Sequence, residues 1–225
     1  MNQKRDEYIP ALKYSWLTSL YNPLLRWTLR ESNFKRHLVE QAQIEGSHRV
    51  LDLGCGTGTL TLMIKKAYPA GEVVGLDGDT KILEIARAKA KNAGLEVRLD
   101  YGMAFNLPYR DESFDRVLSS LLFHHLTREN KDRTLREVFR VLRPRGELHV
   151  ADWGKPQNRL MRLAFLGVQL LDGFHTTADN IKGLLPELCA LAGFKDVEET
   201  ARYATLFGTL SLYRARSRTV CHLQS

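Results

Sequence analysis

Residues 49–58 read R-V-L-D-L-G-C-G-T-G, and this stretch decides the fold that we expect. Its apolar half predicts a short buried strand, and glycine then follows at every second position, at Gly54, Gly56 and Gly58. A helix is expected to begin near Thr59. A strand that passes through a glycine turn into a helix brings backbone N–H groups and a helix N-terminus together, and such a point binds a charged or polar small molecule.

The rest of the chain alternates strands with helices. Apolar runs predict strands at residues 50–53, 72–77, 96–101, 114–119 and 147–152. Helical patterns lie between them, at residues 59–68, 80–92 and 131–142. Because helices separate apolar strands, these strands are expected to form a parallel, doubly wound sheet.

The pattern changes after Trp153. Residues 160–171 and 178–192 read as helices, whereas 195–204 and 206–216 read as strands close enough together for an antiparallel hairpin. The expected fold class is therefore α/β. It has a Rossmann-like doubly wound sheet of seven strands that is mostly parallel and carries an antiparallel C-terminal hairpin.

The length of 225 residues fits one domain with appended elements. Residues 1–46 are expected to form an N-terminal helical leader, which either caps a cleft with its aromatic side chains or packs on the sheet. Residues 47–225 are expected to form the ligand-binding domain, with a helical insert at about residues 156–176.

The formal net charge of +7 favours an anionic partner, unless the basic side chains are simply solvated. Three widely spaced cysteines without a C-x-x-C pair argue against a disulfide framework and against a structural metal site. The sequence shows no secretory signal, and no run approaches the roughly 18 to 20 apolar residues of a membrane span. A cytoplasmic protein is therefore expected.

The glycine turn differs from other nucleotide-binding turns. A dinucleotide-binding G-x-G-x-x-G would need glycine at Thr59, and a phosphate-binding loop would need G-K-[ST], so phosphate-bearing ligands are disfavoured. Asp52 would repel a phosphate but suits an ammonium group, and Asp77, at the end of the next strand, can accept the hydroxyls of a ribose. The implied ligand has a ribose and a positive charge but no phosphate, and S-adenosylmethionine meets that description.

Four motifs resemble those of class I S-adenosylmethionine-dependent methyltransferases and occur in the same order. They are V-L-D-L-G-C-G-T-G at 50–58, V-V-G-L-D-G-D at 73–79, L-P-Y-R-D-E-S-F-D-R-V-L-S-S-L-L-F-H-H-L at 107–126 and V-L-R-P-R-G-E-L-H-V-A-D-W at 141–153. They look most similar to the small-molecule branch that holds menaquinone and ubiquinone C-methyltransferases and phospholipid N-methyltransferases. The resemblance implies that residues 47–225 are an S-adenosylmethionine-binding methyltransferase domain.

The resemblance also implies a set of cofactor-binding residues. They are Asp52, Gly54, Cys55, Gly56, Gly58, Asp77, Gly78, Asp79, Met103, Ala104 and Ser119. The glycine turn with Cys55 would lie against the methionine part and the ribose, Asp52 would receive the amino group directly or through water, and Asp77 would take the ribose hydroxyls. Gly78 and Asp79 would lie beside the adenine, and Met103 and Ala104 at its far edge. Ser119 would back the methionine.

The roles of two of these residues are left undecided by the sequence. The family often has an acid where Met103 stands, so we expect backbone groups or Asn106 to recognise the adenine, while the Met103 thioether packs on the ring. Asp79 equally suits the N-cap of the helix that follows it.

Methyl transfer depends on alignment, and it needs a general base only if the acceptor must lose a proton. Candidate bases near the carboxyl ends of strands, where ligands bind in such sheets, are His124, His125, Asp152 and His175. Residues 123–126 resemble a stretch that the family carries whatever the acceptor, so a structural role is equally open for the first two.

The expected function is methyl transfer to a small, lipophilic acceptor that is quinone-, lipid- or natural-product-like. The aromatic leader and the apolar residues 160–171 would roof the cleft with apolar surface. This small molecule is the expected partner, without nucleic acid or metal, while membrane contact and a homodimer through residues 160–171 stay open. Two alternatives are a non-catalytic regulatory module that binds S-adenosylmethionine, and an RNA methyltransferase.

Overall fold

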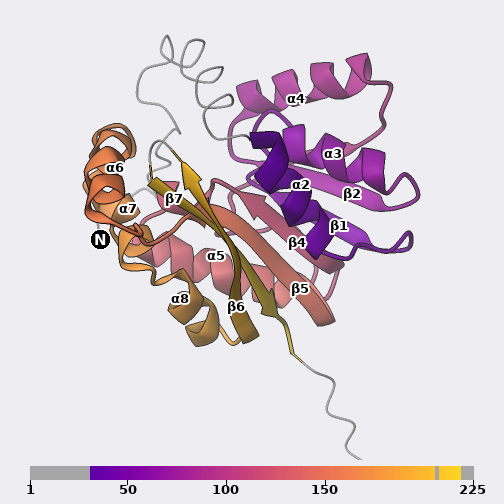
Figure 1. Ribbon diagram of the computed structural model, residues 1–225. Helices are drawn as coiled ribbons and strands as arrows, with labels where there is room; N and C mark the ends of the chain where they lie inside the picture. The colour runs from indigo at the N-terminus through magenta and orange to yellow at the C-terminus, as the bar shows by residue number, and fades with distance from the viewer. Residues whose placement is uncertain (1–30, 206–207, 219–225) are drawn as a thin grey trace, which may run out of the picture.

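The computed structural model describes residues 31–205 and 208–218, and a seven-stranded sheet forms its centre (Figure 1). The strands are β1 (Arg49–Leu53), β2 (Glu72–Asp77), β3 (Arg98–Tyr101), β4 (Phe114–Ser120), β5 (Leu142–Trp153), β6 (Lys195–Thr205) and β7 (Gly208–Arg216). Their order across the sheet is β3-β2-β1-β4-β5-β7-β6. Strands β1 to β5 are parallel, and β7 runs antiparallel to both β5 and β6. The expected α/β class, with its mostly parallel sheet and antiparallel C-terminal hairpin, is confirmed.

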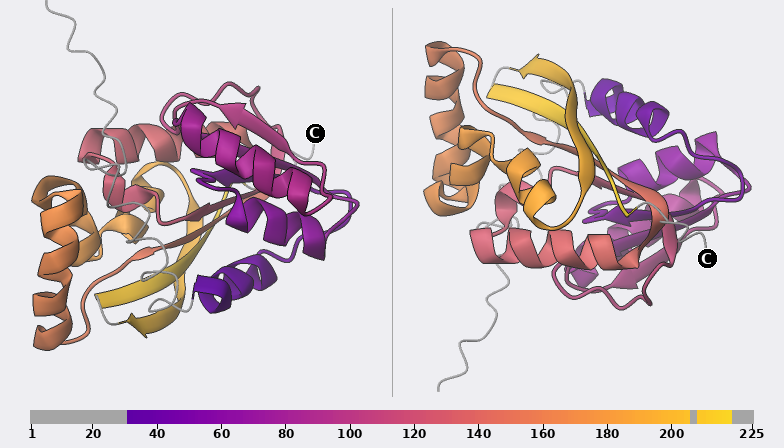
Figure 2. Two further views of the ribbon diagram at one scale, coloured as in Figure 1. Left: turned by 90° about the horizontal axis from the view of Figure 1, so that it is seen from above. Right: turned by 90° about the horizontal axis from the view of Figure 1, so that it is seen from below.

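Helices cover both faces of this sheet. They are α2 (Glu31–Gln41), α3 (Thr59–Ala67), α4 (Thr80–Asn92), α5 (Arg128–Val141), α6 (Arg159–Asp172), α7 (Phe174–Lys182) and α8 (Leu185–Leu191), with a short 3₁₀ helix η1 (Phe123–His125). Apolar side chains of α2 and α3 pack on one face, and those of α5 and α8 pack on the other. The pair α6 and α7 lies beyond one end of the sheet, as the two views in Figure 2 show.

The alternation of side chains along β1 explains how the glycine stretch is placed. Leu51 and Leu53 are buried against α5 and α8, whereas Val50 is buried against α2 and α3. Successive side chains of a strand point to opposite faces, so Asp52 shares the face of Val50. The carboxylate therefore lies under α3.

Two strands begin elsewhere than the sequence predicts. β3 begins at Arg98 instead of residue 96, and β5 begins at Leu142 instead of residue 147. Residues 144–146, which precede the predicted strand, are part of β5 because their backbone pairs with the residues after β7: Arg145 N–H donates to Arg218 O, and Ser217 N–H donates to Gly146 O. This pairing is tertiary and has no local sequence signal.

The helices after β5 also differ from the expectation. The predicted helix at 178–192 is two helices, because Gly183 adopts φ +70° and ends α7 with a left-handed cap. Pro186 then lies in the first turn of α8, where its missing N–H costs nothing. The candidate base His175 belongs to α7. The apolar helix predicted at 160–171 is confirmed as α6.

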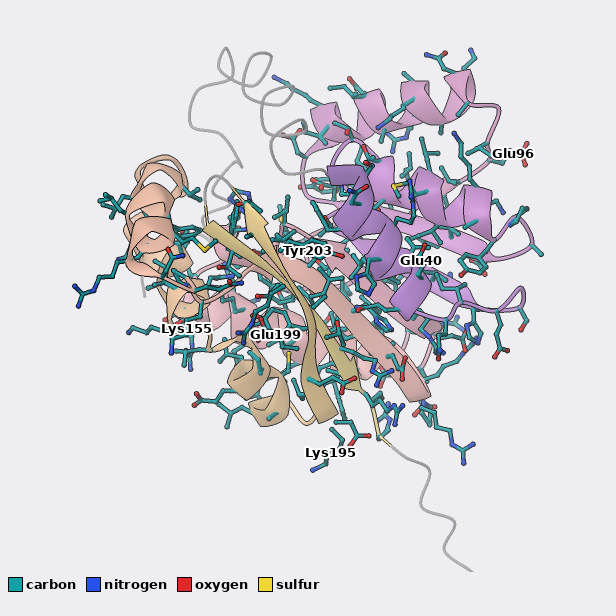
Figure 3. The ribbon with its side chains drawn as sticks, in the orientation of Figure 1. Glu40, Glu96, Lys155, Lys195, Glu199 and Tyr203 are labelled. Atoms are coloured by element: carbon teal, nitrogen blue, oxygen red, sulfur yellow. The ribbon has the colours of Figure 1, made fainter. Side chains whose placement is uncertain are left out.

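The described part of the leader packs on the sheet. Phe34 and Leu38 of α2 are buried in the same apolar cluster as Val50. Nδ1 of His37 lies 2.6 Å from the hydroxyl oxygen of Tyr203, which Figure 3 shows on β6 beside α2. Residues 1–30, with the rest of the expected leader, lie outside the described residues. Within those residues, none of the helices has the length and apolar content needed to cross a membrane.

Candidate functional site

The glycine loop folds over the end of β2 and then starts α3. The N–H groups of Gly54 and Cys55 both donate to the carbonyl oxygen of Leu76, each at 2.9 Å. Gly54, Gly56 and Gly58 have φ angles of +70°, +53° and +73°, a conformation that favours glycine. Gly58 is the residue that precedes α3. The loop thus joins β1, β2 and the N-terminus of α3 at one point.

The three glycines face different surroundings. A Cβ atom built on Gly54 would lie 2.9 Å from Cδ1 of Leu122, and one built on Gly58 would lie 3.1 Å from the Cβ of Ala86. A Cβ on Gly56 would meet no atom within 4 Å. Gly54 and Gly58 are therefore needed for packing inside the protein, whereas the backbone at Gly56 faces open space that a ligand can enter.

Asp77 lies at the end of β2 directly against this open backbone. Its Oδ2 accepts the N–H of Gly56 at 2.8 Å, and its Oδ1 accepts the N–H of Asp79 at 3.0 Å. Burial raises the pKa of Asp77, although these backbone hydrogen bonds oppose the increase. A carboxylate has about four acceptor positions, so two remain for the hydroxyls of a ligand.

Asp52 is enclosed. Its side chain accepts a hydrogen bond from Oγ1 of Thr61 at 2.6 Å, and the residue is only 1% exposed. Burial raises the pKa of Asp52 to about 6, although the Thr61 hydrogen bond and the positive charge of Lys35 oppose the increase. The burial leaves no direct contact with an amino group, so that predicted role would have to act through the field of the carboxylate or through Thr61.

Lys35 is a candidate that the sequence did not indicate. It lies on α2, it is buried to 9% exposure, and its ammonium is close enough for its charge to lower the pKa of Asp52. A lysine within a helical pattern normally reads as an outward residue, and only the packing of α2 on the sheet turns Lys35 inward. The glycine motif therefore has a buried cation beside it.

The residues expected at the adenine end lie next to Asp77. Gly102 N–H donates to the Asp77 carbonyl oxygen, and Met103 forms an isolated bridge with Asn106. Ala104 is partly buried against the core. Gly78 joins Asp77 to Asp79, whose Oδ1 accepts the N–H groups of Lys81 and Ile82 as the N-cap of α4. The capping alternative for Asp79 is confirmed.

The turn after β4 supports the glycine loop from the other side. The Ser119 hydroxyl donates to the carbonyl oxygen of Leu53 at 3.0 Å, so the structure uses it between strands and does not direct it at a ligand. Leu121 has φ +60°, an uncommon conformation for a residue with a side chain. The next residue, Leu122, makes the contact with Gly54 described above.

The structure brings three of the four candidate bases together. Nδ1 of His124 lies 2.7 Å from Oδ1 of Asp152, and both side chains are buried. Although burial raises it, the pKa of Asp152 is lowered overall by the charge of and hydrogen bond from His124. Burial and the neighbouring His124 lower the pKa of His125 to about 3, so this imidazole is neutral near pH 7 and a poor base. The side chain of His175 lies outside the described side chains.

In this geometry the Asp152 carboxylate is enclosed and the His125 imidazole is a weak base, so both side chains suit a structural role, and general-base catalysis by either residue stays a prediction. An enclosed carboxylate has no access to an acceptor, and an imidazole with a pKa of about 3 has a low affinity for a proton at neutral pH. Cys55 is likewise a packed thiol whose pKa is raised by burial. Among the described residues, no three His, Cys, Asp or Glu side chains are grouped as metal ligands.

A separate groove of about 590 Å³ lies far from this site. It is formed by the amino ends of β2 and β3 with α4, near Glu96 in Figure 3. The glycine loop and Asp77 lie at the carboxyl ends of the strands, where ligands bind in sheets of this kind. The groove is therefore not part of the candidate site.

Comparison with known proteins identifies similar chains. Residues 50–146 match a family model described as a methyltransferase domain. The chain is 31% identical over 187 residues to demethylmenaquinone methyltransferase from Lactobacillus johnsonii, which covers 74% of this chain and 76% of that protein. It is 38% identical over 157 residues to demethylmenaquinone methyltransferase from Thermus thermophilus, with 69% and 67% covered.

A solved structure has the same fold. The crystal structure of an S-adenosylmethionine-dependent methyltransferase from Aquifex aeolicus superposes with a TM-score of 0.66 at 19% identity, over 93% of this chain and 99% of the other. At this low identity the similarity concerns the fold alone.

Proposed function

This chain belongs to the S-adenosylmethionine-dependent methyltransferases, and from that membership we propose that it methylates a small, lipophilic acceptor of the quinone class. The names of the two sequence relatives support a quinone precursor as the acceptor. The observation that carries the proposal for the cofactor site is the open backbone at Gly56 beside the Asp77 carboxylate.

The donor set of this site suits S-adenosylmethionine. Asp77 offers acceptor positions for two ribose hydroxyls, and the open backbone at Gly56 allows close approach of the ligand. Lys35 supplies a positive charge for a carboxylate, while the buried Asp52 supplies a negative field for an ammonium group. When bound, the cofactor supplies a methyl group on a sulfonium ion.

The contribution of the protein to the reaction is alignment. Asp152 is enclosed and His125 has a pKa of about 3, so both are weak candidates for taking a proton from an acceptor at pH 7. The chain therefore positions the acceptor against the methyl group and excludes water, which are effects of proximity and desolvation. We expect His125→Ala to reduce kcat less than 10-fold, whereas loss of a general base would cost roughly 10² to 10⁴.

We place the acceptor beside α6 and the ends of β5 and β7, where apolar side chains form a buried cluster. Phe165 of α6 packs edge-on against Trp153, with ring centroids 5.4 Å apart, and Val168 joins the same apolar cluster as Leu210. Binding beside such an apolar cluster suits an acceptor with an aromatic ring and an apolar tail better than a nucleic acid.

The outer side of α6 suits contact with an anionic lipid surface, where a lipophilic acceptor would be held. Leu163 is 64% exposed, and the basic residues Lys155, Arg159 and Arg162 beside it are also exposed. Each basic side chain near such a surface contributes about 1 kcal/mol of attraction. Co-sedimentation with vesicles of anionic and of neutral lipid tests this contact, and Leu163→Glu should weaken it.

The activity is tested by incubating the enzyme with methyl-labelled S-adenosylmethionine and one acceptor at a time. The acceptors are a demethylated naphthoquinol, phosphatidylethanolamine vesicles and total RNA. Label in the quinol supports the proposal. Label in the lipid or in the RNA would show that the acceptor belongs to that class instead. Tight binding of S-adenosylhomocysteine without label in any acceptor would instead show a binding module.

A further inference from the structure

We propose that Asp152 is a positioning residue for the cofactor, because its carboxylate fixes the turn after β4 that supports the glycine loop. The inference rests on the cofactor site proposed above. It gives a role to a buried acid that the reaction itself does not use.

The carboxylate holds the start of η1. Its Oδ2 accepts the N–H of Phe123 at 2.7 Å and the N–H of His124 at 3.4 Å. These amides belong to the first residues of the short helix, where N–H groups have no partner within the helix. Asp152 therefore acts as a cap supplied from another strand.

The second oxygen fixes the rest of the turn. Oδ1 accepts hydrogen bonds from Nδ1 of His124 and from the N–H of Trp153, both at 2.7 Å. Because an ionised carboxylate only accepts, the proton shared with His124 lies on Nδ1. Asp152 is fully buried, so no water competes for these hydrogen bonds.

The turn fixed in this way touches the glycine loop. Leu121 is held in its left-handed conformation with its N–H on Ala151 O, and Leu122 then packs against Gly54. A turn released from Asp152 would let Leu121 relax and would move Leu122 away from Gly54. The loop would then lose the position that leaves open space for the ligand at Gly56.

The same carboxylate also connects to α7, the helix that follows α6. Nδ2 of Asn180, on α7, donates to Trp153 O at 3.0 Å and approaches Oδ1 of Asp152 at 3.4 Å. Lys131 of α5 donates to the carbonyl oxygen of Thr176, which is also on α7, at 2.5 Å. Asp152 therefore joins α7, the turn after β4 and the end of β5 at one buried point.

The test compares Asp152→Asn with a matched variant, Asp115→Asn. Asp115 also accepts a backbone N–H, from Arg49 at 2.8 Å, and an arginine, Arg143, at 2.6 Å, but it lies near the start of β4. Affinity for S-adenosylhomocysteine is measured by calorimetry below the unfolding temperature of each variant. Hydrogen exchange of the Phe123 and His124 amides is measured in the same samples.

We expect Asp152→Asn to weaken the affinity for S-adenosylhomocysteine at least 10-fold and to speed hydrogen exchange of both amides. Asp115→Asn should lower Tm but leave this affinity within twofold of the wild type. A lower Tm with unchanged affinity for Asp152→Asn would overturn the inference in favour of a merely structural role. A loss of kcat with unchanged affinity would overturn it in favour of a chemical role.

Two further variants keep the test decisive. If Asp152→Asn does not fold, Asn180→Ala takes its place, because it removes one contact with Asp152. This variant should weaken the affinity for S-adenosylhomocysteine at least threefold, and unchanged affinity would overturn the inference. Asp77→Ala reports on the cofactor site itself. Normal binding by Asp77→Ala would refute that site, whereas loss in Asp77→Ala alone would refute only the role of Asp152.

Discussion

The N–H of Gly56 donates to Oδ2 of Asp77 at 2.8 Å, so the residue that we propose to bind the ribose also holds the glycine loop in place. The other oxygen, Oδ1, accepts the N–H of Asp79 and so holds the chain at the start of α4. One side chain thus fixes the backbone on both sides of the cofactor site before any ligand binds. Such pre-organisation reduces the entropy that binding must overcome.

Asp77→Ala is expected to weaken the affinity for S-adenosylhomocysteine by about 100-fold or more. Hydrogen bonds to a charged group are lost both within the loop and to the ligand. Isothermal titration calorimetry measures this loss. Met103→Ala is the matched control at the adenine end and should weaken binding less than 10-fold, since a thioether contributes only packing. Normal binding by Asp77→Ala would contradict the assignment of this site.

The glycine loop offers a second prediction, because its glycines face different surroundings. Gly56→Ala adds a methyl group in open space, so it should cost only about 1 kcal/mol of stability, from the left-handed backbone, yet abolish close approach of the ligand. Gly58→Ala also places its Cβ 3.1 Å from Ala86, so it should lower the free energy of unfolding further.

Urea unfolding and S-adenosylhomocysteine titration of the two glycine variants check this contrast. Gly56→Ala should lose binding at least 10-fold while it remains folded, and Gly58→Ala should show the larger loss of stability. The opposite ranking of the two losses of stability would mean that the loop is packed differently from the structure described here.

The central features of this site have local sequence signals. Alternate glycines after an apolar run predict the loop at Gly54, and an acid at the end of the next strand predicts Asp77 as its neighbour. The antiparallel hairpin also follows from two apolar segments with little chain between them. These features depend on residues that are close in sequence or on neighbouring parallel strands.

The features that the sequence did not predict depend on tertiary contacts. The inward position of Lys35 follows from the way α2 packs on the sheet, and the early start of β5 follows from pairing with Ser217. Asp152 at a strand end resembles a catalytic acid, and only the fold shows that its oxygens already accept hydrogen bonds from Phe123, His124, Trp153 and Asn180. The pattern of single residues carries no information about such partners.

Lys35→Met should weaken the affinity for S-adenosylhomocysteine about 10-fold. The carboxylate of the ligand's amino acid part would lose a buried positive charge that lies within the field of Asp52. Calorimetry with 5′-methylthioadenosine provides the control, since this ligand lacks the amino acid carboxylate. The variant should bind 5′-methylthioadenosine like the wild type. Equal losses for the two ligands would show that Lys35 acts through folding and not through the carboxylate.

The enclosed Asp52 makes stability depend on pH. Burial raises its pKa from 3.8 to about 6, so the folded state binds a proton more tightly than the unfolded state does. The stabilisation is fully present below pH 4 and is lost as pH rises through 6, by about 3 kcal/mol in total. Urea unfolding between pH 4 and 7 should therefore show wild-type stability falling relative to Asp52→Asn, which keeps the acceptor for Thr61.

The same carboxylate should link cofactor binding to a proton. An ammonium group brought near Asp52 favours its ionised form, so binding at about pH 6 should release part of a proton and strengthen as pH rises from 5 to 7. Calorimetric titration of S-adenosylhomocysteine in two buffers with different ionisation enthalpies measures the proton released. Asp52→Asn should release none at this pH, and equal release by wild type and variant would assign the proton to another group.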